Sequence, residues 1–326
     1  MRTTVLGGGA WGTALASHFA RVGLPVRMWI REPEVAAAVN EQRLNPAYLP
    51  GVELPDGLRA TSRLDEALAD AEAVLVVVPS EFCRGIYREA AGLAPKDAIL
   101  VSATKGLEVD TLQRMSEVAA AEAPGRAVAV LSGPSFALEV AKALPTAVVV
   151  ASAEHSVAER VQRPLASRTF RVYSSEDVVG VELAGALKNV IAIAAGIVDG
   201  LGYGHNIMAA LITRGLAEIT RLAVALGAKP DTLAGLAGLG DLVLTCTGGL
   251  SRNRTVGQRL GRGLLLAEAS AGMHPEGVRT TLAACALAER RGIEMPIARQ
   301  MKAVLYEGKP PRPAVDELML RSLKRE

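Results

Sequence analysis

The feature that most constrains the fold is a series of short apolar runs in the first half of the chain, separated by stretches of helical pattern. These runs are nearly continuous in Val, Leu, Ile and Ala, and they do not alternate apolar with polar positions. Such runs are typical of strands in a parallel sheet, because helices cover both faces of that sheet. The predicted strands are TTVLGGG, VRMWI, AVLVVV, AILVSA, AVAVLSG, AVVVAS and FRVYSS.

Helical patterns lie between many of these strands, and the succession predicts the class of the fold. The predicted helices of this half are 10–23, 33–43, 64–70, 110–122 and 155–167. An alternation of strands and helices predicts a doubly wound α/β sheet with right-handed crossovers.

The character of the chain changes after about Ser175. No convincing strand pattern follows, and the predicted helices there are 176–198, 205–227, 230–237, 252–261, 279–291 and 297–306. A length of 326 residues suits two domains. We therefore expect an α/β domain over 1–175 and an all-α domain over 176–326.

Composition excludes several classes of function. The net charge is only +2 and no block of Lys or Arg occurs, so nucleic acid is not an expected partner. The 3 cysteines and 4 histidines are widely spaced and form no zinc pattern, which indicates a reducing compartment and no metal site. The N-terminus enters a strand pattern at once, and the apolar runs are broken before the roughly 20 residues of a membrane span. We expect a cytoplasmic protein.

A glycine pattern directly follows the first predicted strand and opens the first predicted helix. It consists of Gly7, Gly9 and Gly12 in a G-x-G-x-x-G spacing. In this context Gly7 permits a tight turn, Gly9 lets a pyrophosphate approach the backbone, and Gly12 lets the helix pack on the strand. The helix N-terminus adds N–H donors for the pyrophosphate. We therefore predict a Rossmann-type dinucleotide site over residues 7–12, a segment that includes Ala10.

The end of the second predicted strand bears on the choice of dinucleotide. NAD-selective sites usually carry an acid there, whereas an arginine accommodates the 2′-phosphate of NADP. Here Arg31 comes first and Glu32 follows, just before Pro33. Glu32 alone could be an acid at a helix start, and Arg31 alone could be a surface residue. The order favours NADP(H), with NAD(H) still possible.

Two loops after predicted strands carry residues suited to ligand binding. Lys105 in SATKGLE and Ser135 in SGPSFA both follow strands, and ligands bind at the carboxyl edge of a parallel sheet. The turn at Gly133 can direct backbone N–H groups and Ser135 toward a ligand. Taken singly, each segment is more often a plain strand-to-helix loop.

The helical half contains a second polar group of residues. Asp241 lies between Gly240 and an apolar run, where an unpaired carboxylate would be unfavourable. Ser251, Arg252 and Asn253 offer a hydroxyl, a guanidinium and an amide in succession, which suits a phosphate. The same three residues equally fit a polar helix N-terminus, since Ser is a favoured cap.

Lys188 is the most unusual residue of the helical half, because it lies in the apolar stretch ELAGALKNVIAIAAG. Its neighbours on the same helical face are small or apolar: Val181, Ala184, Gly185, Ile191, Ala192 and Ala195. For an isolated lysine, the simplest arrangement is a buried stem with its ammonium in water. A lysine that is desolvated beside other cations instead has a lowered pKa and can act in acid/base catalysis.

Together these motifs resemble one family, the bacterial NAD(P)-dependent glycerol-3-phosphate dehydrogenases. The likeness runs in order from about residue 3 to about residue 310, through GGGAWGTALA, VVVPS, ATKGLE, SGPSFA, ELAGALKNVIAIAAGI, LITRGLAE, AGLGDLVLT and SRNR. The resemblance implies a Rossmann domain, a helical C-terminal domain, and interconversion of dihydroxyacetone phosphate and sn-glycerol 3-phosphate. It also implies a role in supplying glycerol 3-phosphate for phospholipid synthesis.

The resemblance implies roles for individual residues. Lys188 matches the acid/base lysine and a substrate contact. The other matching substrate positions are Lys105, Gly133, Ser135, Asp241, Ser251, Arg252 and Asn253. The matching coenzyme positions are Trp11, Arg31, Tyr48, Lys105, Ala137, Arg252 and Glu276. The segment MHPEG departs from the family pattern, because His274 and Pro275 precede Glu276 where VVEG is expected.

Two other functions compete with this interpretation. One is a related β-hydroxy-acid dehydrogenase that acts on a carboxylate, which the phosphate-suited triplet 251–253 disfavours. The other is a non-catalytic NADP(H)-binding sensor, which would not need Lys188 and Asp241. The apolar helices expected at 205–227 and 279–291 could form a homodimer face or only the core of the domain.

Overall fold

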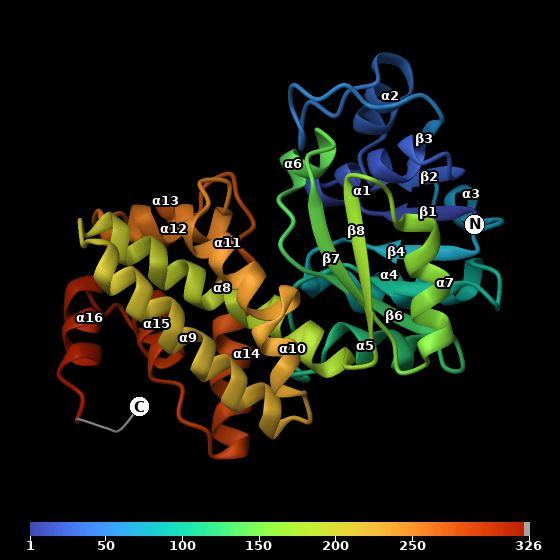
Figure 1. The fold of residues 1–326 in the computed structure, drawn as a ribbon. Helices are drawn as coiled ribbons and strands as arrows, with labels where there is room; N and C mark the ends of the chain where they lie inside the picture. Colours follow the sequence, from blue (N-terminus) through green and yellow to red (C-terminus); the bar gives the residue numbers. More distant parts are fainter. Residues whose placement is uncertain (323–326) are drawn as a thin grey trace. The chain divides into compact units, whose positions relative to one another are not determined.

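The computed structural model describes residues 1–322, and the chain divides into two compact units. Unit 1 comprises Met1–Lys105 and Gln113–Val181, and unit 2 comprises Gly106–Leu112 and Glu182–Glu326. Figure 1 shows strands with helices in the first part of the chain and helices in the remainder. The sequence predicts a change from strands to helices near Ser175. This position lies shortly before the boundary between the units at Val181 and Glu182.

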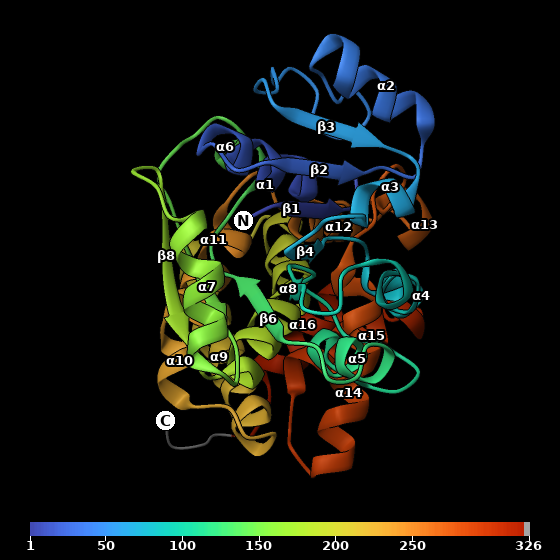
Figure 2. The ribbon, with the colours of Figure 1, turned by 90° about the vertical axis from the view of Figure 1, so that its right-hand side faces the viewer.

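Unit 1 is built on one sheet of eight strands in the order β3-β2-β1-β4-β5-β6-β7-β8. Its strands are β1 Thr3–Leu6, β2 Val26–Trp29, β3 Leu58–Thr61, β4 Ala73–Val76, β5 Ile99–Ser102, β6 Val128–Ser132, β7 Thr146–Ala151 and β8 Phe170–Ser175. All neighbouring pairs are parallel except β6 and β7, which are antiparallel. Figure 2 shows β1, β2 and β3 side by side in this sheet.

The apolar runs are explained by burial of both sheet faces. In β4, Leu75 belongs to one hydrophobic cluster, whereas Val74 and Val76 belong to the other. Helices α1 Ala10–Arg21, α2 Pro33–Gln42, α6 Ala137–Ala141 and α7 His155–Leu165 supply the first cluster. Helices α3 Leu64–Leu68, α4 Ser80–Leu93 and α5 Met115–Glu122 supply the second. Since successive residues point to opposite faces, a strand covered on both sides must be apolar throughout.

The expected α/β sheet is therefore present, with two differences in detail. The strand β3 was not expected, because its short segment LRAT alternates buried and exposed positions at the sheet edge. The antiparallel pair β6 and β7 was not expected either, and the connection between these strands carries only the five-residue helix α6.

In unit 2 every regular element that the structure describes is helical. The elements are α8 Val178–Gly200, which begins at the end of unit 1, α9 His205–Ala225, α10 Pro230–Ala234, the π-helix η1 Leu236–Gly240, α11 Asp241–Thr247, α12 Arg252–Gly261, α13 Leu266–Ala269, α14 Glu276–Arg291, α15 Pro296–Tyr306 and α16 Pro311–Met319. By length and composition α8 could cross a membrane, but its most apolar window is entirely buried within the folded chain. We therefore describe α8 as the core helix of this unit.

Two glycine pairs bring α8 and α12 into backbone contact. A Cβ added at Gly257 would lie 2.0 Å from the carbonyl oxygen of Ile193, and one at Gly196 would lie 2.0 Å from the carbonyl oxygen of Arg254. Gly200 and Gly261 meet the facing backbone in the same way, one turn further along each helix. Only glycine permits this approach, which fixes the start of α12 against the helix that carries Lys188.

Candidate active site

The glycine turn in unit 1 has the geometry that a dinucleotide requires. Gly7 has a φ of +131°, and a Cβ there would lie 2.6 Å from the carbonyl oxygen of Val77. A Cβ at Gly12 would lie 2.1 Å from the carbonyl oxygen of Gly7, whereas one at Gly9 would meet nothing within 4 Å. The helix α1 begins at Ala10 without a side-chain cap. The turn therefore leaves room and N–H donors for a pyrophosphate, so these residues fit the predicted coenzyme.

Unit 1 brings together four of the predicted site residues. Lys105 donates hydrogen bonds to the carbonyl oxygen of Gly133 at 2.8 Å and to Oγ of Ser135 at 3.4 Å. Its Nζ also lies 5.9 Å from the ring centroid of Trp11. The Nε1 of Trp11 is buried and has no hydrogen-bond partner among residues 1–322. Ala137 is the first residue of α6, which follows the same loop.

Arg31, Glu32 and Tyr48 form a small polar cluster beyond the end of β2. The guanidinium of Arg31 lies 3.0 Å from Oε1 of Glu32, and the Tyr48 hydroxyl donates to the same oxygen at 3.3 Å. The side chain of Arg31 is 73% exposed, so it is accessible to a ligand. Partial burial and the Glu32 carboxylate raise the pKa of Tyr48, which keeps its phenol protonated as a donor.

In unit 2, the ammonium of Lys188 is buried. The residue is 6% exposed, and its Nζ lies 2.6 Å from Oδ1 of Asp241 and 2.6 Å from Oγ1 of Thr245. Asp241 and Thr245 are themselves buried. The snorkelling arrangement is therefore wrong for Lys188. Its charged neighbour here is a carboxylate rather than another cation, and this carboxylate compensates the buried ammonium.

The sequence AGLGD places Asp241 by means of an irregular turn. The N–H of Gly240 bonds to the carbonyl oxygen of Gly235 at 3.1 Å, as in a π-helix, and η1 leads directly into α11. A Cβ at Gly238 would lie 2.0 Å from the carbonyl oxygen of Leu233. The predicted helix 230–237 is thus two elements, and π-turns of this kind are frequent at functional sites.

Thr245 is a site residue that sequence reasoning missed. Its hydroxyl also donates to the carbonyl oxygen of Asp241 at 2.7 Å, one helical turn away. The signal was available, because a hydroxyl four residues after a functional aspartate lies on the same helical face.

The triplet 251–253 forms the N-terminus of α12, one of the two roles that the sequence left open. Ser251 caps α12 by accepting a hydrogen bond from the N–H of Arg254 at 3.2 Å. Arg252 is exposed at the first position of this helix, where its guanidinium and the N-terminal N–H groups can meet an anion. Asn253 donates to Oδ1 of Asn189 at 3.0 Å. Asn189, next to Lys188 in sequence, was not predicted as part of the site.

Glu276 is the first residue of α14, which begins three residues earlier than expected. The N–H of Gly277 donates to Oδ1 of Asn253 at 2.9 Å, and a Cβ at Gly277 would lie 2.5 Å from the carbonyl oxygen of Asn189. Pro275, which follows the unusual His274, is the N-cap residue of this helix and has a φ of −79°. The start of α14 is therefore held against the triplet despite this departure.

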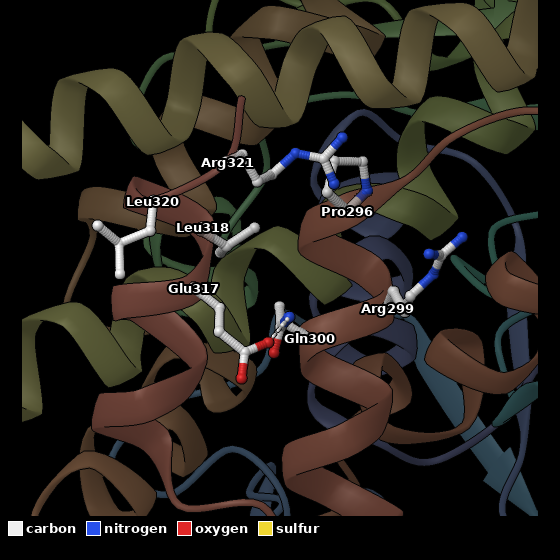
Figure 3. A pocket seen from close by; sticks show the side chains of 7 residues that line it. All are labelled: Pro296, Arg299, Gln300, Glu317, Leu318, Leu320 and Arg321. Carbon is white, nitrogen blue, oxygen red and sulfur yellow. Dashed lines mark hydrogen bonds between the residues drawn. The ribbon is translucent and has the colours of Figure 1, made fainter. Parts of the chain in front are cut away.

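Other features of the described residues bear on metal binding, thiol chemistry and pockets. Within residues 1–322, no group of three or more His, Cys, Asp or Glu side chains could hold a metal ion. Burial raises the pKa of Cys246 to about 12, so its thiol stays protonated and unreactive. A pocket of about 310 Å³ contains none of the predicted site residues (Figure 3). Its lining residues are Pro296, Arg299, Gln300, Glu317, Leu318, Leu320 and Arg321.

The chain is similar to known proteins over its whole length. Sequence profiles described as the N-terminus and the C-terminus of NAD-dependent glycerol-3-phosphate dehydrogenase match residues 2–158 and 177–316. A glycerol-3-phosphate dehydrogenase [NAD(P)+] of Geobacter sulfurreducens is 53% identical over 330 aligned positions, which cover 100% of this chain and 98% of the relative. One from Nitratidesulfovibrio vulgaris strain DP4 is 52% identical and is covered completely.

A comparison with solved structures leads to the same family as these relatives. The crystal structure of glycerol-3-phosphate dehydrogenase from Coxiella burnetii has a TM-score of 0.95 at 42% identity and covers 98% of this chain and 99% of its own. A ketopantoate reductase from Ralstonia eutropha has a TM-score of 0.62 at 17% identity, which shows a shared fold alone. The coenzyme turn, the buried lysine and the full-length matches lead to one conclusion: the chain belongs to the NAD-dependent glycerol-3-phosphate dehydrogenase family.

Proposed function

We propose that this chain is an oxidoreductase that interconverts dihydroxyacetone phosphate and sn-glycerol 3-phosphate with NAD(P)H. The observation that carries the proposal is the buried contact of Lys188 with Asp241 and Thr245 in a chain of this family. A buried ammonium with a compensating carboxylate is a suitable proton donor, and neither a structural role nor mere coenzyme binding requires it.

When bound, NAD(P)H would supply the hydride for the C2 carbonyl, and residues of the chain would provide binding and proton transfer. Lys188 donates a proton to the forming alkoxide and takes it back in the reverse direction. Asp241 and Thr245 hold the ammonium of Lys188 in place through contacts of 2.6 Å with Nζ. General acid catalysis of this kind typically contributes about 10² to 10⁴ in rate.

The substrate phosphate is assigned to the start of α12. Arg252 binds the phosphate oxygens with its exposed guanidinium, as an arginine fork does. The N-terminus of α12 adds favourable backbone donors. In unit 1, Lys105, Gly133 and Ser135 are assigned to the hydroxyl groups of the substrate, since Lys105 already contacts the other two.

We propose a preference for NADP(H), with NAD(H) also used. Binding of the 2′-phosphate would break the ion pair between Arg31 and Glu32. The cost is small, because exposed pairs of this type contribute only about 0 to 1 kcal/mol to stability. With NAD(H), the Glu32 carboxylate can instead accept hydrogen bonds from the ribose hydroxyls. Trp11, Tyr48, Lys105, Ala137, Arg252 and Glu276 are assigned to the remaining coenzyme contacts.

One assay tests this function directly. NADPH and NADH oxidation are followed side by side with dihydroxyacetone phosphate, and with simple 2-oxo acids as alternative acceptors. We expect turnover with dihydroxyacetone phosphate only, and a lower KM for NADPH than for NADH. Arg31→Ala should raise the KM for NADPH more than that for NADH, whereas Arg59→Ala, which removes an exposed arginine from β3, should change neither. Coenzyme binding without turnover would favour the sensor instead.

We also propose a cytoplasmic homodimer that supplies glycerol 3-phosphate for phospholipid synthesis. Three cysteines without a disulfide are usual in a reducing compartment. The surface of α9 presents half-exposed Ile212 and Leu216 and an exposed Val224, which suits a face between two copies. Light scattering after gel filtration tests the dimer, and a mass near 34.0 kDa would contradict it.

A further inference from the structure

The buried side chain of Asn45 joins two segments to which the coenzyme contacts of unit 1 belong. It lies in the loop LNPAYLPG, between α2 and β3, and it is 0% exposed. The same loop contains Tyr48, whereas the glycine turn lies far earlier in the sequence. None of the motifs used above assigns a role to Asn45.

Every hydrogen-bonding group of this amide is used. Its Nδ2 donates to the carbonyl oxygen of Gly8 at 2.8 Å and to Oγ1 of Thr13 at 2.8 Å. Its Oδ1 accepts a hydrogen bond from the N–H of Tyr48 at 3.1 Å. Thr13 is also buried, and its hydroxyl donates to the same Gly8 carbonyl at 3.2 Å. A fully satisfied buried network of this kind holds its members in one arrangement.

The bond to Gly8 has a consequence for Gly9. In a trans peptide the C=O and the N–H point in opposite directions, and the described chain has no cis peptide. When Asn45 and Thr13 hold the Gly8 carbonyl on the buried side, the N–H of Gly9 therefore points away from that side. A Cβ at Gly9 would meet nothing within 4 Å, so the space beside this residue is open. The pyrophosphate of a dinucleotide belongs beside the second glycine of such a turn.

The bond to Tyr48 orients the other end of the site. Asn45 accepts from the N–H three residues later, as a cap does at a helix start, and the N–H of Leu49 bonds to the Asn45 carbonyl oxygen at 2.9 Å. This turn sets the position of Tyr48, whose hydroxyl contacts Glu32 at 3.3 Å. The cluster of Arg31, Glu32 and Tyr48 thus depends on the same amide as the glycine turn.

We infer that Asn45 is a positioning residue for the coenzyme: it aims the N–H of Gly9 at the pyrophosphate and sets Tyr48 beside Arg31 and Glu32. This inference rests on the proposed function only in that NAD(P)H is the ligand. Because the pyrophosphate is common to both coenzymes, the residue acts on NADPH and NADH alike. It does not touch the reacting atoms, so its effect is on binding rather than on the chemical step.

The test is direct titration of the full-length protein with NADPH and NADH, followed by coenzyme fluorescence, and steady-state kinetics. Asn45→Ala should raise both dissociation constants about ten-fold or more, the change expected when one hydrogen bond to a charged group is lost. At saturating NADPH, kcat and the KM for dihydroxyacetone phosphate should stay within about three-fold of wild type, because the chemical step is untouched. Asn45→Asp keeps the acceptor for Tyr48 but loses both donors, so it should bind as weakly as Asn45→Ala.

Asn40→Ala is the matched control. The amide of Asn40 also joins two backbone groups, since it donates to the Ala60 carbonyl oxygen at 2.7 Å and accepts from the Ala60 N–H at 2.9 Å. Neither of these bonds reaches the glycine turn, so the loss of this amide should lower the melting temperature without changing either dissociation constant. If Asn45→Ala does not fold, Thr13→Val removes the partner hydroxyl without changing its shape, and it should weaken both coenzymes several-fold.

A folded Asn45→Ala protein, or failing that a folded Thr13→Val protein, whose dissociation constants lie within two-fold of wild type would overturn the inference. A decrease in kcat with unchanged coenzyme binding would overturn it as well. If the wild-type chain binds neither coenzyme, the proposed function fails first, so the two failures are distinguishable.

Discussion

At the scale of single residues, Lys188 shows how a helix can hold a charge in its apolar core. Its ammonium is placed against the Asp241 carboxylate at 2.6 Å, and both side chains are buried. Removal of one member of a buried pair leaves the other uncompensated, which costs about 3 to 5 kcal/mol. Substitutions at this pair therefore affect stability as well as catalysis, and the two effects must be measured separately.

Lys188→Met should lower kcat by about 10² to 10⁴, the usual contribution of a general acid. The dissociation constant of NADPH should be nearly unchanged, because Lys188 is not among the residues assigned to coenzyme contacts. Steady-state assays and NADPH titration measure these two effects, with a melting curve to verify folding. Lys142→Met removes an exposed lysine and is the control. A near-wild-type kcat in Lys188→Met would exclude the acid/base assignment.

Glu218 is another buried acidic residue, and within residues 1–322 no cationic side chain is in hydrogen-bond contact with it. It lies in α9, is 2% exposed, and accepts hydrogen bonds from the N–H groups of Ile297 at 2.8 Å and Ala298 at 3.3 Å. Burial raises the pKa of Glu218 from 4.5 to about 7, and the two N–H donors at the start of α15 oppose this increase. The residue therefore titrates near neutral pH in the folded chain.

A pH dependence of stability follows from Glu218. Between about pH 4.5 and 7 the folded chain holds a proton on Glu218 that the unfolded chain has lost. The stabilising contribution is complete below pH 4.5 and is lost as pH rises through about 7, for a total of about 3 kcal/mol. Urea unfolding at several pH values measures how the free energy of unfolding depends on pH. Glu218→Gln should lose the part of this dependence that lies between about pH 4.5 and 7, while Glu89→Gln, at an exposed site, should keep it. Equal slopes in Glu218→Gln and wild type would contradict the prediction.

At the scale of elements, the contact of α8 with α12 decides where the residues proposed to bind the substrate phosphate lie. The two helices approach until glycine is required on both, at Gly196 and Gly257. Because α12 begins at Arg252 and α8 carries Lys188, this contact sets the distance between the residues proposed for phosphate binding and for proton transfer. Close packing, rather than any single hydrogen bond, builds this part of the site.

Gly257→Ala tests the contact between these helices. Alanine is intrinsically better than glycine in a helix by about 1 kcal/mol, but here its Cβ would lie 2.0 Å from a backbone oxygen. Overpacking of this kind typically costs about 1 to 3 kcal/mol, so net destabilisation and a higher KM for dihydroxyacetone phosphate are expected. A Cβ at Gly249 would meet nothing within 4 Å, so Gly249→Ala should neither destabilise the protein nor raise this KM. A more stable Gly257→Ala protein would show that the helices can separate without loss.

At the scale of the whole molecule, coenzyme binding and chemistry should be separable. NADPH at about 100 times its dissociation constant should stabilise the folded chain by about 2.7 kcal/mol, whatever happens to the substrate. A melting-temperature titration should show this increase in wild type and in Lys188→Met, and Asn45→Ala should need much more NADPH for the same effect. An increase absent from Lys188→Met would mean that the lysine contributes to coenzyme binding instead.

Much of the architecture could be predicted because it depends on local pattern. The continuous apolar runs predicted β4 and β5, since strands covered on both faces must be apolar throughout. The edge strand β3 was missed, because its alternating pattern is short and looks like a loop. The antiparallel turn into β7 was missed for a different reason: strand direction depends on the path of the chain and leaves no mark on composition.

The residues of the candidate site likewise fall into those that a local pattern predicts and those that it does not. Residues inside recognisable motifs, such as Gly9, Lys188 and Asp241, could be predicted from the sequence. Asn189 and Asn45 could not, because each bonds to another residue through an amide, a polar group that is common on any surface. A polar side chain becomes informative only when burial shows that it must be paired.

The sequence by itself determined the class of fold, the place of the coenzyme turn and the identity of the unusual lysine. Periodicity and glycine spacing are local properties, and a strand followed by a tight turn and a helix needs no distant partner to be recognised. Tertiary structure alone decided that the Lys188 ammonium is buried against Asp241, that Gly257 touches the backbone of α8, and that Asn45 holds the glycine turn. These contacts join residues far apart in the chain, and only packing brings such residues within hydrogen-bond or van der Waals distance.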